Sequence, residues 1–316
     1  MRRYFLTITS LFVIMASLAR AALVGPVAVT GGAMKGVPGH APEIAVFRGI
    51  PYAAAPVGDL RWKPPAPAVR WTGTKSADKF GGDCIHPGKQ VAVASEDCLY
   101  LNVWTGAAVA TERRPVAVIM AGSEGTSGLD GEVLAAQGIV VVAANSRTGL
   151  MGFLAHPDLT AESDKKVSGN YGLLDQIAVL DWVQHNIGAF GGDARRVTLV
   201  GPLAALLAAS PLTKGMLVRA IATGSGAATG LAEAEKAGDT FAQAENAHSI
   251  RFLRPMEAGD LVQATGEEHY SPGPVVDGWV LTKGWEKVQS GVQVKPANGT
   301  FDLNHPSAVW LDFIKQ

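Results

Sequence analysis

Val197-Thr198-Leu199-Val200-Gly201 leads directly into Pro202-Leu203-Ala204-Ala205-Leu206-Leu207. The first five residues are β-branched or apolar and end in glycine, which is typical of a parallel strand covered on both faces. The alanine-rich residues that follow predict a helix with Pro202 at its first position, where a missing N–H is harmless. A strand followed at once by a helix indicates an α/β fold. The junction between them contains no serine.

Other segments repeat this strand-and-helix pattern. Two continuous apolar runs, Val116–Met120 and Ile139–Ala144, predict central strands. Apolar residues at helical spacing predict a helix over Leu173–Asn186, and a second helix is expected at about Ala232–Glu245. Shorter extended segments are expected nearer the N-terminus, at Val27–Thr30, Ile44–Arg48 and Leu99–Trp104. The alternation predicts a mostly parallel central sheet with flanking helices, in one continuous domain over residues 22–316. Residues 292–316 show no clear pattern.

Residues 1–21 have the features of a secretory signal peptide. Met1-Arg2-Arg3 is positively charged, an apolar stretch runs from Tyr4 to about Leu18, and small residues precede a cleavage position after Ala21. A membrane anchor is the alternative, but the stretch is shorter than the ~20 residues of a spanning helix and contains polar residues. We therefore expect an exported protein, secreted or periplasmic, without a stable membrane span.

Composition argues against several classes of function. The net charge of −1, with scattered basic residues, gives no electrostatic footprint for nucleic acid or an anionic membrane. No Cys-x-x-Cys motif or histidine pair accompanies the two cysteines, so we expect no metal site and no cofactor. In an exported chain, Cys84 and Cys98 predict one disulfide, closing a loop of about 15 residues and contributing roughly 3 kcal/mol. Two unpaired thiols are the alternative.

The tract Glu96-Asp97-Cys98-Leu99-Tyr100-Leu101-Asn102-Val103-Trp104 resembles a signature of type B carboxylesterases, which are secreted α/β-hydrolases related to cholinesterases. Further landmarks of this family follow in the family's order between Val27 and Gly291. They are Phe47–Ala53, Asn145–Gly149, Gly169–Gln176, Phe190–Asp193 and Pro274–Gly278. The resemblance implies an α/β-hydrolase fold and a carboxylic-ester hydrolase by descent, with a small carboxylic ester as substrate.

The resemblance also implies structural roles for individual residues. The family's cysteines at the positions of Cys84 and Cys98 are bridged, and the residues matching Arg61 and Glu96 form a buried ion pair. His156 matches a structural loop histidine rather than a base. Three polar residues at a helix start are expected to satisfy free backbone N–H groups with their side-chain oxygens: Asn170, Asp175 and Gln176.

The family's catalytic triad has no counterpart in this chain. Its serine lies on a sharp Gly-x-Ser-x-Gly turn after the strand that matches Val197–Gly201. This chain has several residues fewer than the family before Ser210, and the shortening removes the turn. The segment Val292–Gln316 matches neither the family's acid nor its histidine, and we expect its His305 at the surface. The resemblance therefore implies an α/β-hydrolase sheet shortened at its C-terminal side.

The family's oxyanion loop matches Ala121-Gly122-Ser123-Glu124-Gly125. The backbone N–H groups of Gly122 and Ser123 can still donate to an anion, although Glu124 adds an unfavourable negative charge. Because this loop follows a strand and resembles a nucleophile motif, Ser123 is also a weak candidate for a relocated nucleophile. Ser225, in Gly224-Ser225-Gly226, is a weaker one.

Two classes of function remain from the sequence. In the first, which the resemblance implies, the chain is a carboxylesterase-family protein, and we expect negligible turnover because the nucleophile, base and acid are all unmatched. The alternative is a non-catalytic secreted binding protein, a pseudoenzyme. In either case, a strand near Arg219–Thr223 is expected at an edge of the shortened sheet unless the helix near Ala232–Glu245 or the tail covers it. An uncovered edge of this kind favours self-association.

Overall fold

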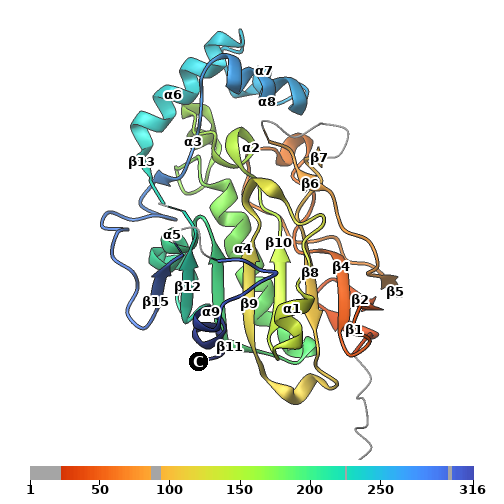
Figure 1. Cartoon of the computed structure of the whole chain (residues 1–316). Coiled ribbons are helices and arrows are strands. Elements are labelled where there is room, and N and C mark those ends of the chain that lie inside the picture. The colour runs from red at the N-terminus through yellow and green to blue at the C-terminus, as the bar shows by residue number, and fades with distance from the viewer. Residues whose placement is uncertain (1–22, 87–93, 225, 298–300) are drawn as a thin grey trace, which may run out of the picture.

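The computed structural model describes residues 23–86, 94–224, 226–297 and 301–316 (Figure 1). Within these residues, the centre of the molecule is an eight-stranded sheet with the strand order β15-β12-β11-β9-β10-β8-β4-β3. The strands from β15 to β10 are parallel, and β8, β4 and β3 are antiparallel. This confirms the predicted mostly parallel central sheet. In the same order, the strands are Gln293–Pro296, Arg219–Ala222, Gly192–Gly201, Arg114–Met120, Val140–Ala144, Tyr100–Thr105, Ala45–Pro51 and Val37–Pro38.

Both faces of the central strands are buried. Along β9, Val116 and Val118 belong to one hydrophobic cluster, whereas Ala117 and Ile119 belong to another. Side chains alternate between the two faces of a strand, so these clusters are two core layers on opposite sides of the sheet. Strands buried on both sides are apolar at nearly every position, which explains the near-continuous apolar runs in the sequence.

Helices cover the sheet on both faces (Figure 1). The α4 and α5 side chains pack into the core layer that contains Val116, and those of α1 and α9 pack into the layer that contains Ala117. The helices α2, α3, α6, α7 and α8 gather beyond one end of the strands. The bounds of α1 to α9 are Glu132–Ala136, Gly149–Phe153, Pro157–Glu162, Tyr171–Asn186, Ala204–Ala209, Leu231–Ala244, Ile250–Leu253, Ala258–Glu267 and Ala308–Lys315.

Smaller sheets complete the fold. β1, β2 and β5 form a three-stranded sheet near the N-terminus, and β6 pairs with β7 and β13 with β14. Their bounds are Val27–Val29, Gly32–Lys35, Thr74–Ser76, Asp83–Cys84, Ala94–Ser95, Thr229–Gly230 and Val275–Val276. None of the described helices combines the length and the apolarity that a membrane crossing requires. The predicted signal peptide over residues 1–21 and the candidate Ser225 lie outside the described residues.

The strand near Arg219–Thr223 was expected at an edge unless the helix near Ala232–Glu245 or the tail covers it, and the structure shows the tail covering it. β12 pairs with β11 on one side and with β15 on the other, where Arg219 is opposite Gln293. The C-terminal segment that contains β15 therefore covers β12, and β15 becomes the edge strand of the central sheet. The sequence gives little sign of β15, because a four-residue edge strand of mixed polarity has neither a continuous apolar run nor a strict alternation.

Helix α6 lies unusually close to the segment that follows α2. A Cβ atom placed on Gly238 would lie 1.8 Å from the backbone oxygen of Ala155. Gly238→Ala is therefore expected to push α6 outward and to lower the free energy of unfolding by about 1–3 kcal/mol, despite the better helix propensity of alanine. Urea denaturation followed by circular dichroism measures the change.

The matched control is Gly266→Ala in α8, where a Cβ atom would meet no other atom within 4 Å. This variant is expected to be as stable as the parent protein or slightly more stable. Equal stability of the two alanine variants would contradict the tight approach of α6.

Candidate functional site

Three loops meet at the carboxyl ends of the parallel strands. A Cβ atom on Gly122, after β9, would lie 3.6 Å from Cγ of Pro202, after β11. A Cβ atom on Gly224, after β12, would lie 2.8 Å from the backbone oxygen of Pro202. In open α/β sheets, ligands bind in the crevice outside the carboxyl ends of the strands. These loops therefore mark the position of the candidate site.

The turn after β11 carries no reactive side chain. β11 ends at Gly201, and α5 begins at Ala204 with Leu203 at the capping position. Pro202 thus lies in the turn, and the prediction that it occupies the first helical position was wrong, because two residues are needed to reverse the chain. The next serine, Ser210, is buried, and its hydroxyl donates to the backbone oxygen of Val280 at 2.7 Å. That hydroxyl is part of the scaffold.

The loop after β9 presents backbone N–H groups that can donate hydrogen bonds to an anion. Gly122–Glu124 form a short 3-10 helix. Gly122 and Ser123 hold the first N–H groups of this helix, which have no acceptor within it. Gly122 and Gly125 have φ angles of 61° and 75°, a region that favours glycine. Ser123 is exposed, and its hydroxyl bonds to no described residue.

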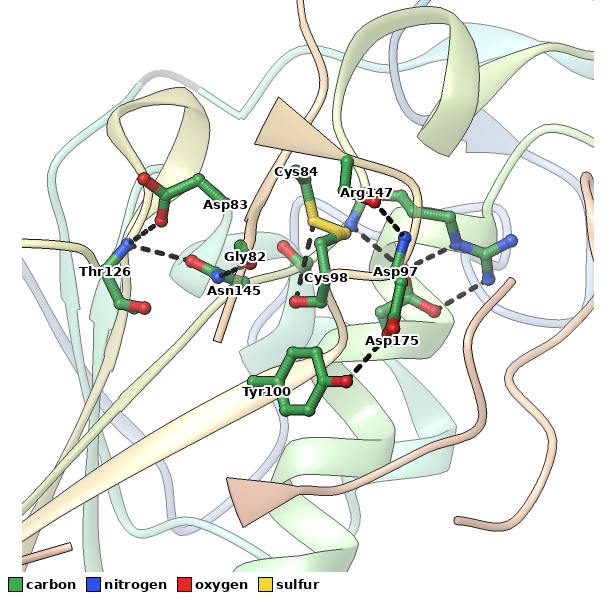
Figure 2. The surroundings of a disulfide bond; sticks show 12 residues. Gly82, Asp83, Cys84, Asp97, Cys98, Tyr100, Thr126, Asn145, Arg147 and Asp175 are labelled. Atoms are coloured by element: carbon green, nitrogen blue, oxygen red, sulfur yellow. Dashed lines mark hydrogen bonds and ion pairs between the residues drawn. A yellow bond between two sulfur atoms is a disulfide. The ribbon is translucent and has the colours of Figure 1, made fainter. Parts of the chain in front are cut away.

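Asp83 and Asn145 hold this loop in place (Figure 2). Asp83 is buried, and its Oδ1 accepts hydrogen bonds from the N–H groups of Thr126 at 3.0 Å and Ser127 at 3.1 Å. The Ser127 hydroxyl donates to the other oxygen of the same carboxylate. The N–H of Thr126 also donates to Oδ1 of Asn145 at 2.9 Å. Sequence reasoning missed Asp83, because nothing in its neighbourhood relates it to residues more than 40 positions away.

The predicted disulfide and the predicted ion pair lie beside Asp83 and its hydrogen bonds. Cys84, next to Asp83, is bonded to Cys98 (Figure 2). Arg61 donates from Nε to Oε1 of Glu96 at 2.7 Å, and both side chains are largely buried. Nη1 of Arg61 donates in addition to the backbone oxygens of Arg254 and Met256, at 2.6 Å each. The ion pair thereby joins the signature tract to the segment that precedes α8.

The start of α4 differs from the prediction. Asn170 makes no side-chain capping bond to the helix; its Nδ2 donates to the backbone oxygen of Val275 at 2.7 Å and to Oδ2 of Asp277 at 2.9 Å. Gln176 donates to the hydroxyl of Ser146 at 3.1 Å. These polar side chains were expected to cap the helix, but they tie it to other segments, because tertiary partners are available in the buried surroundings.

Asp175 was also expected to cap α4, and instead it forms a buried ion pair. It accepts from Nε and Nη2 of Arg147 at 2.8 and 2.7 Å, and from the backbone N–H of Arg147 at 3.0 Å. The two side chains are 3% and 0% exposed. Burial lowers the pKa of Arg147, but the neighbouring Asp175 carboxylate raises it, and the net direction is upward. Burial and the charge of Asp175 also raise the pKa of Tyr52.

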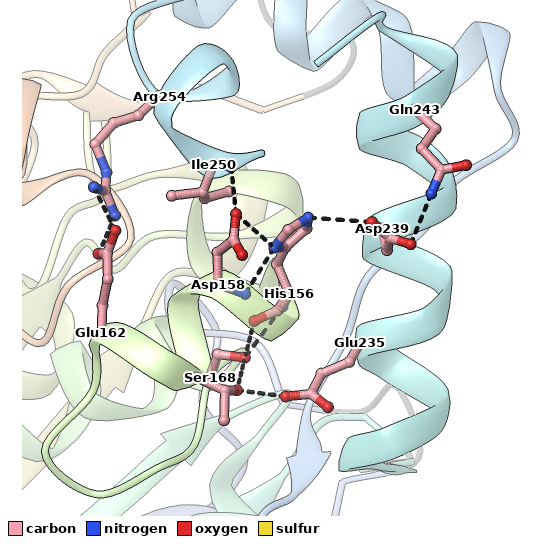
Figure 3. A network of polar contacts seen from close by, with 10 residues as sticks. His156, Asp158, Glu162, Ser168, Glu235, Asp239, Gln243, Ile250 and Arg254 are labelled. Carbon is pink, nitrogen blue, oxygen red and sulfur yellow. Dashed lines mark hydrogen bonds and ion pairs between the residues drawn. The ribbon is translucent and has the colours of Figure 1, made fainter. Parts of the chain in front are cut away.

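His156 and His305 both lie next to acidic side chains, and their contacts are of the kind that stabilise a fold. His156 is buried, and its Nδ1 accepts from the backbone N–H of Asp158 at 3.0 Å at the start of α3 (Figure 3). Its Nε2 lies 3.6 Å from Oδ1 of Asp239 on α6. His305 is exposed, and its Nδ1 lies 3.1 Å from Oδ2 of Asp302. Among the described residues, neither ring is hydrogen-bonded to a serine hydroxyl.

One group of described residues has the chemistry of metal ligands. The side-chain ligand atoms of His40, Asp130 and Glu132 lie within 4.8 Å of one another. The carboxylate of Glu132 accepts from the backbone N–H groups of His40 at 2.9 Å and Ala41 at 3.1 Å, and Asp130 accepts from the N–H of Glu132 at 2.9 Å. These bonds give the two carboxylates a structural role at the start of α1.

The sheet order, the helices on both faces, and the donor loop beside a strand-turn-helix junction define an α/β-hydrolase. Known proteins agree with this fold. A sequence model described as the carboxylesterase family matches residues 25–300. The chain therefore belongs to the carboxylesterase family.

Individual relatives are similar over most of the chain. Fumonisin B1 esterase of Sphingopyxis macrogoltabida is 43% identical over 278 residues, covering 79% of this chain and 50% of the relative. The structure of carboxylesterase EST55 of Geobacillus stearothermophilus superposes with a TM-score of 0.76 at 31% identity, over 85% of this chain and 60% of that one. A PNB esterase superposes with a TM-score of 0.73 at 30% identity, over 85% and 62% of the two chains.

Thyroglobulin of Sus scrofa is 44% identical over 163 residues, which are 50% of this chain and 6% of thyroglobulin. The chain thus spans half the length of the curated esterase that it matches and about three fifths of the solved carboxylesterases.

Proposed function

We propose that this carboxylesterase-family chain keeps the ester-binding end of the fold but turns over carboxylic esters at a negligible rate. The observation that carries the proposal is the turn Gly201-Pro202-Leu203, which joins β11 to α5 without a hydroxyl. Ester hydrolysis by a serine hydrolase requires serine Oγ to attack the carbonyl carbon while a histidine takes its proton. The position at the end of β11 supplies no atom for the first step.

The oxyanion side of the site supports an ester-type ligand. The N–H groups of Gly122 and Ser123 begin a short helix that Asp83 and Asn145 hold in place. Preorganised backbone donors of this kind stabilise negative charge on a carbonyl oxygen. The name of the relative fumonisin B1 esterase gives an ester substrate for that protein. For this chain we therefore propose small carboxylic esters as the ligand class.

A relocated nucleophile is the competing possibility within this function. Ser123 is exposed at the carboxyl end of β9, where a nucleophile would have access to substrate. Its hydroxyl makes no hydrogen bond to a described residue, so no base activates it there. We propose that Ser123 acts through its backbone N–H only.

The test combines a p-nitrophenyl short-chain ester with a fluorophosphonate probe. The purified protein is expected to hydrolyse the ester no faster than buffer and to remain unlabelled, since loss of a nucleophile lowers kcat by roughly a millionfold. A family carboxylesterase with an elbow serine serves as the positive control. Stoichiometric labelling that disappears in Ser123→Ala would establish a relocated nucleophile and overturn the proposal.

The setting of the protein is part of the proposal. Residues 1–21 have the pattern of a secretory signal, and the Cys84–Cys98 disulfide suits an oxidising compartment, so we propose export to the periplasm or medium. The short edge strand β15 is the segment through which self-association would occur. Ester binding without turnover would make the protein a secreted binding protein, the second function that the sequence leaves open.

A further inference from the structure

One nitrogen of the Arg147 guanidinium has no partner among the described residues. Nε and Nη2 donate to the carboxylate of Asp175, and Nη2 also donates to the backbone oxygen of Lys63 at 2.9 Å. Nη1 is buried, and no described group accepts from it. The whole side chain is 3% exposed. A charged donor that loses its hydration without gaining an acceptor is costly, so we expect Nη1 to have an acceptor.

A small cavity adjoins the same side chain. Its volume is about 10 Å³, close to the smallest volume that holds one water molecule. Cys84 and Cys98 line it from the disulfide, and Arg61 and Trp62 line it from the segment near the N-terminus. The cavity and the unpartnered nitrogen are independent observations on Arg147, and both indicate one small bound molecule.

The lining has the polar groups that an ordered water requires. A buried water typically makes about three hydrogen bonds. Nη1 of Arg147 can donate to its oxygen. The carboxylate of Glu96 and the hydroxyl of Ser95 also belong to the lining and can accept its hydrogens. Each carboxylate oxygen of Glu96 accepts one hydrogen bond from Arg61, which leaves it a further lone pair.

The charges favour a neutral molecule over an anion. Arg61 and Arg147 are the cations of the lining, and Glu96 is its carboxylate. Each arginine already has a carboxylate at hydrogen-bonding distance, Glu96 for Arg61 and Asp175 for Arg147. The four charges sum to zero, so a buried anion would add a charge without a partner.

We propose that one water molecule binds in this cavity and accepts a hydrogen bond from Nη1 of Arg147. The water completes the hydrogen bonding of a buried guanidinium. Arg147 follows β10, and Cys98 belongs to the signature tract, so the water lies where these two parts of the chain meet. The inference does not rest on the proposed function, because it uses neither the turn after β11 nor the loop after β9.

A high-resolution crystal structure of the protein, from crystals grown with sodium bromide, tests the proposal. We expect a fully occupied density peak at about 2.7–3.2 Å from Nη1, without an anomalous bromine signal. The assignment is overturned if no peak lies there, if the peak carries the bromine signal, or if Nη1 bonds directly to a protein atom.

Two variants give the matched comparison. Arg147→Met with Asp175→Leu removes the donor and its carboxylate together, which avoids an unpaired buried charge, and the peak should disappear. Lys63→Ala keeps the backbone oxygen that accepts from Nη2 and removes a side chain that does not line the cavity, so the peak should remain. A peak that persists in the double variant would contradict Arg147 as the donor. The parent structure decides the assignment even if the double variant does not fold.

Discussion

Asp175→Ala is expected to lower the free energy of unfolding by about 3–5 kcal/mol, the largest effect of any single substitution considered for this protein. The guanidinium of Arg147 is 3% exposed, and Asp175 supplies two of its charge-assisted hydrogen bonds. Without the carboxylate, a positive charge remains buried with little compensation. Urea denaturation followed by tryptophan fluorescence measures the loss.

Asp181→Asn on the same helix is the control. Asp181 is 58% exposed and lies 3.5 Å from His185 one turn later, so its replacement should change the free energy of unfolding by less than about 0.5 kcal/mol. A midpoint shift in Asp175→Ala that is no larger than that of Asp181→Asn would show that the buried pair does not stabilise α4.

Removal of the disulfide by Cys84→Ser with Cys98→Ser is expected to lower the free energy of unfolding by about 3 kcal/mol, because the unfolded chain regains the freedom of a loop of roughly 15 residues. The effect should reach the loop after β9, since Asp83 precedes Cys84 and accepts from the N–H groups of Thr126 and Ser127. Amide hydrogen exchange at those two groups is therefore expected to accelerate.

A reducing agent provides the internal comparison. Dithiothreitol should shift the urea midpoint of the parent protein to that of the double variant, and it should leave the double variant unchanged. A parent midpoint that does not respond to complete reduction, verified by thiol titration, would mean that the bond does not contribute to stability.

The central sheet could be predicted because its residues carry a local signal. Val116–Met120 and Ile139–Ala144 are apolar at every position, Val197–Gly201 is apolar except for Thr198, and the structure places the three segments side by side with both faces buried. β15 could not be predicted, because it is short, half-exposed and mixed in polarity. It becomes a strand only where the edge of β12 offers it hydrogen-bonding partners.

For the candidate site too, one part could be predicted from the sequence and another could not. The missing serine after Gly201 is visible in the sequence itself. Other contacts could not be predicted, because they join residues that are far apart in the chain. They are the hydrogen bonds from the loop after β9 to Asp83 and those between Asn170 and Val275. Helix-start patterns favoured local capping for Asn170 and Asp175, but buried partners elsewhere in the fold compete successfully for the same polar atoms.

The turn Gly201-Pro202-Leu203 is bordered closely by the segment after β12, since a Cβ atom on Gly224 would lie 2.8 Å from the backbone oxygen of Pro202. A larger residue at position 224 would therefore push the segments after β11 and β12 apart. Glycine at this position thus sets the spacing between two neighbouring connections at the rim of the sheet.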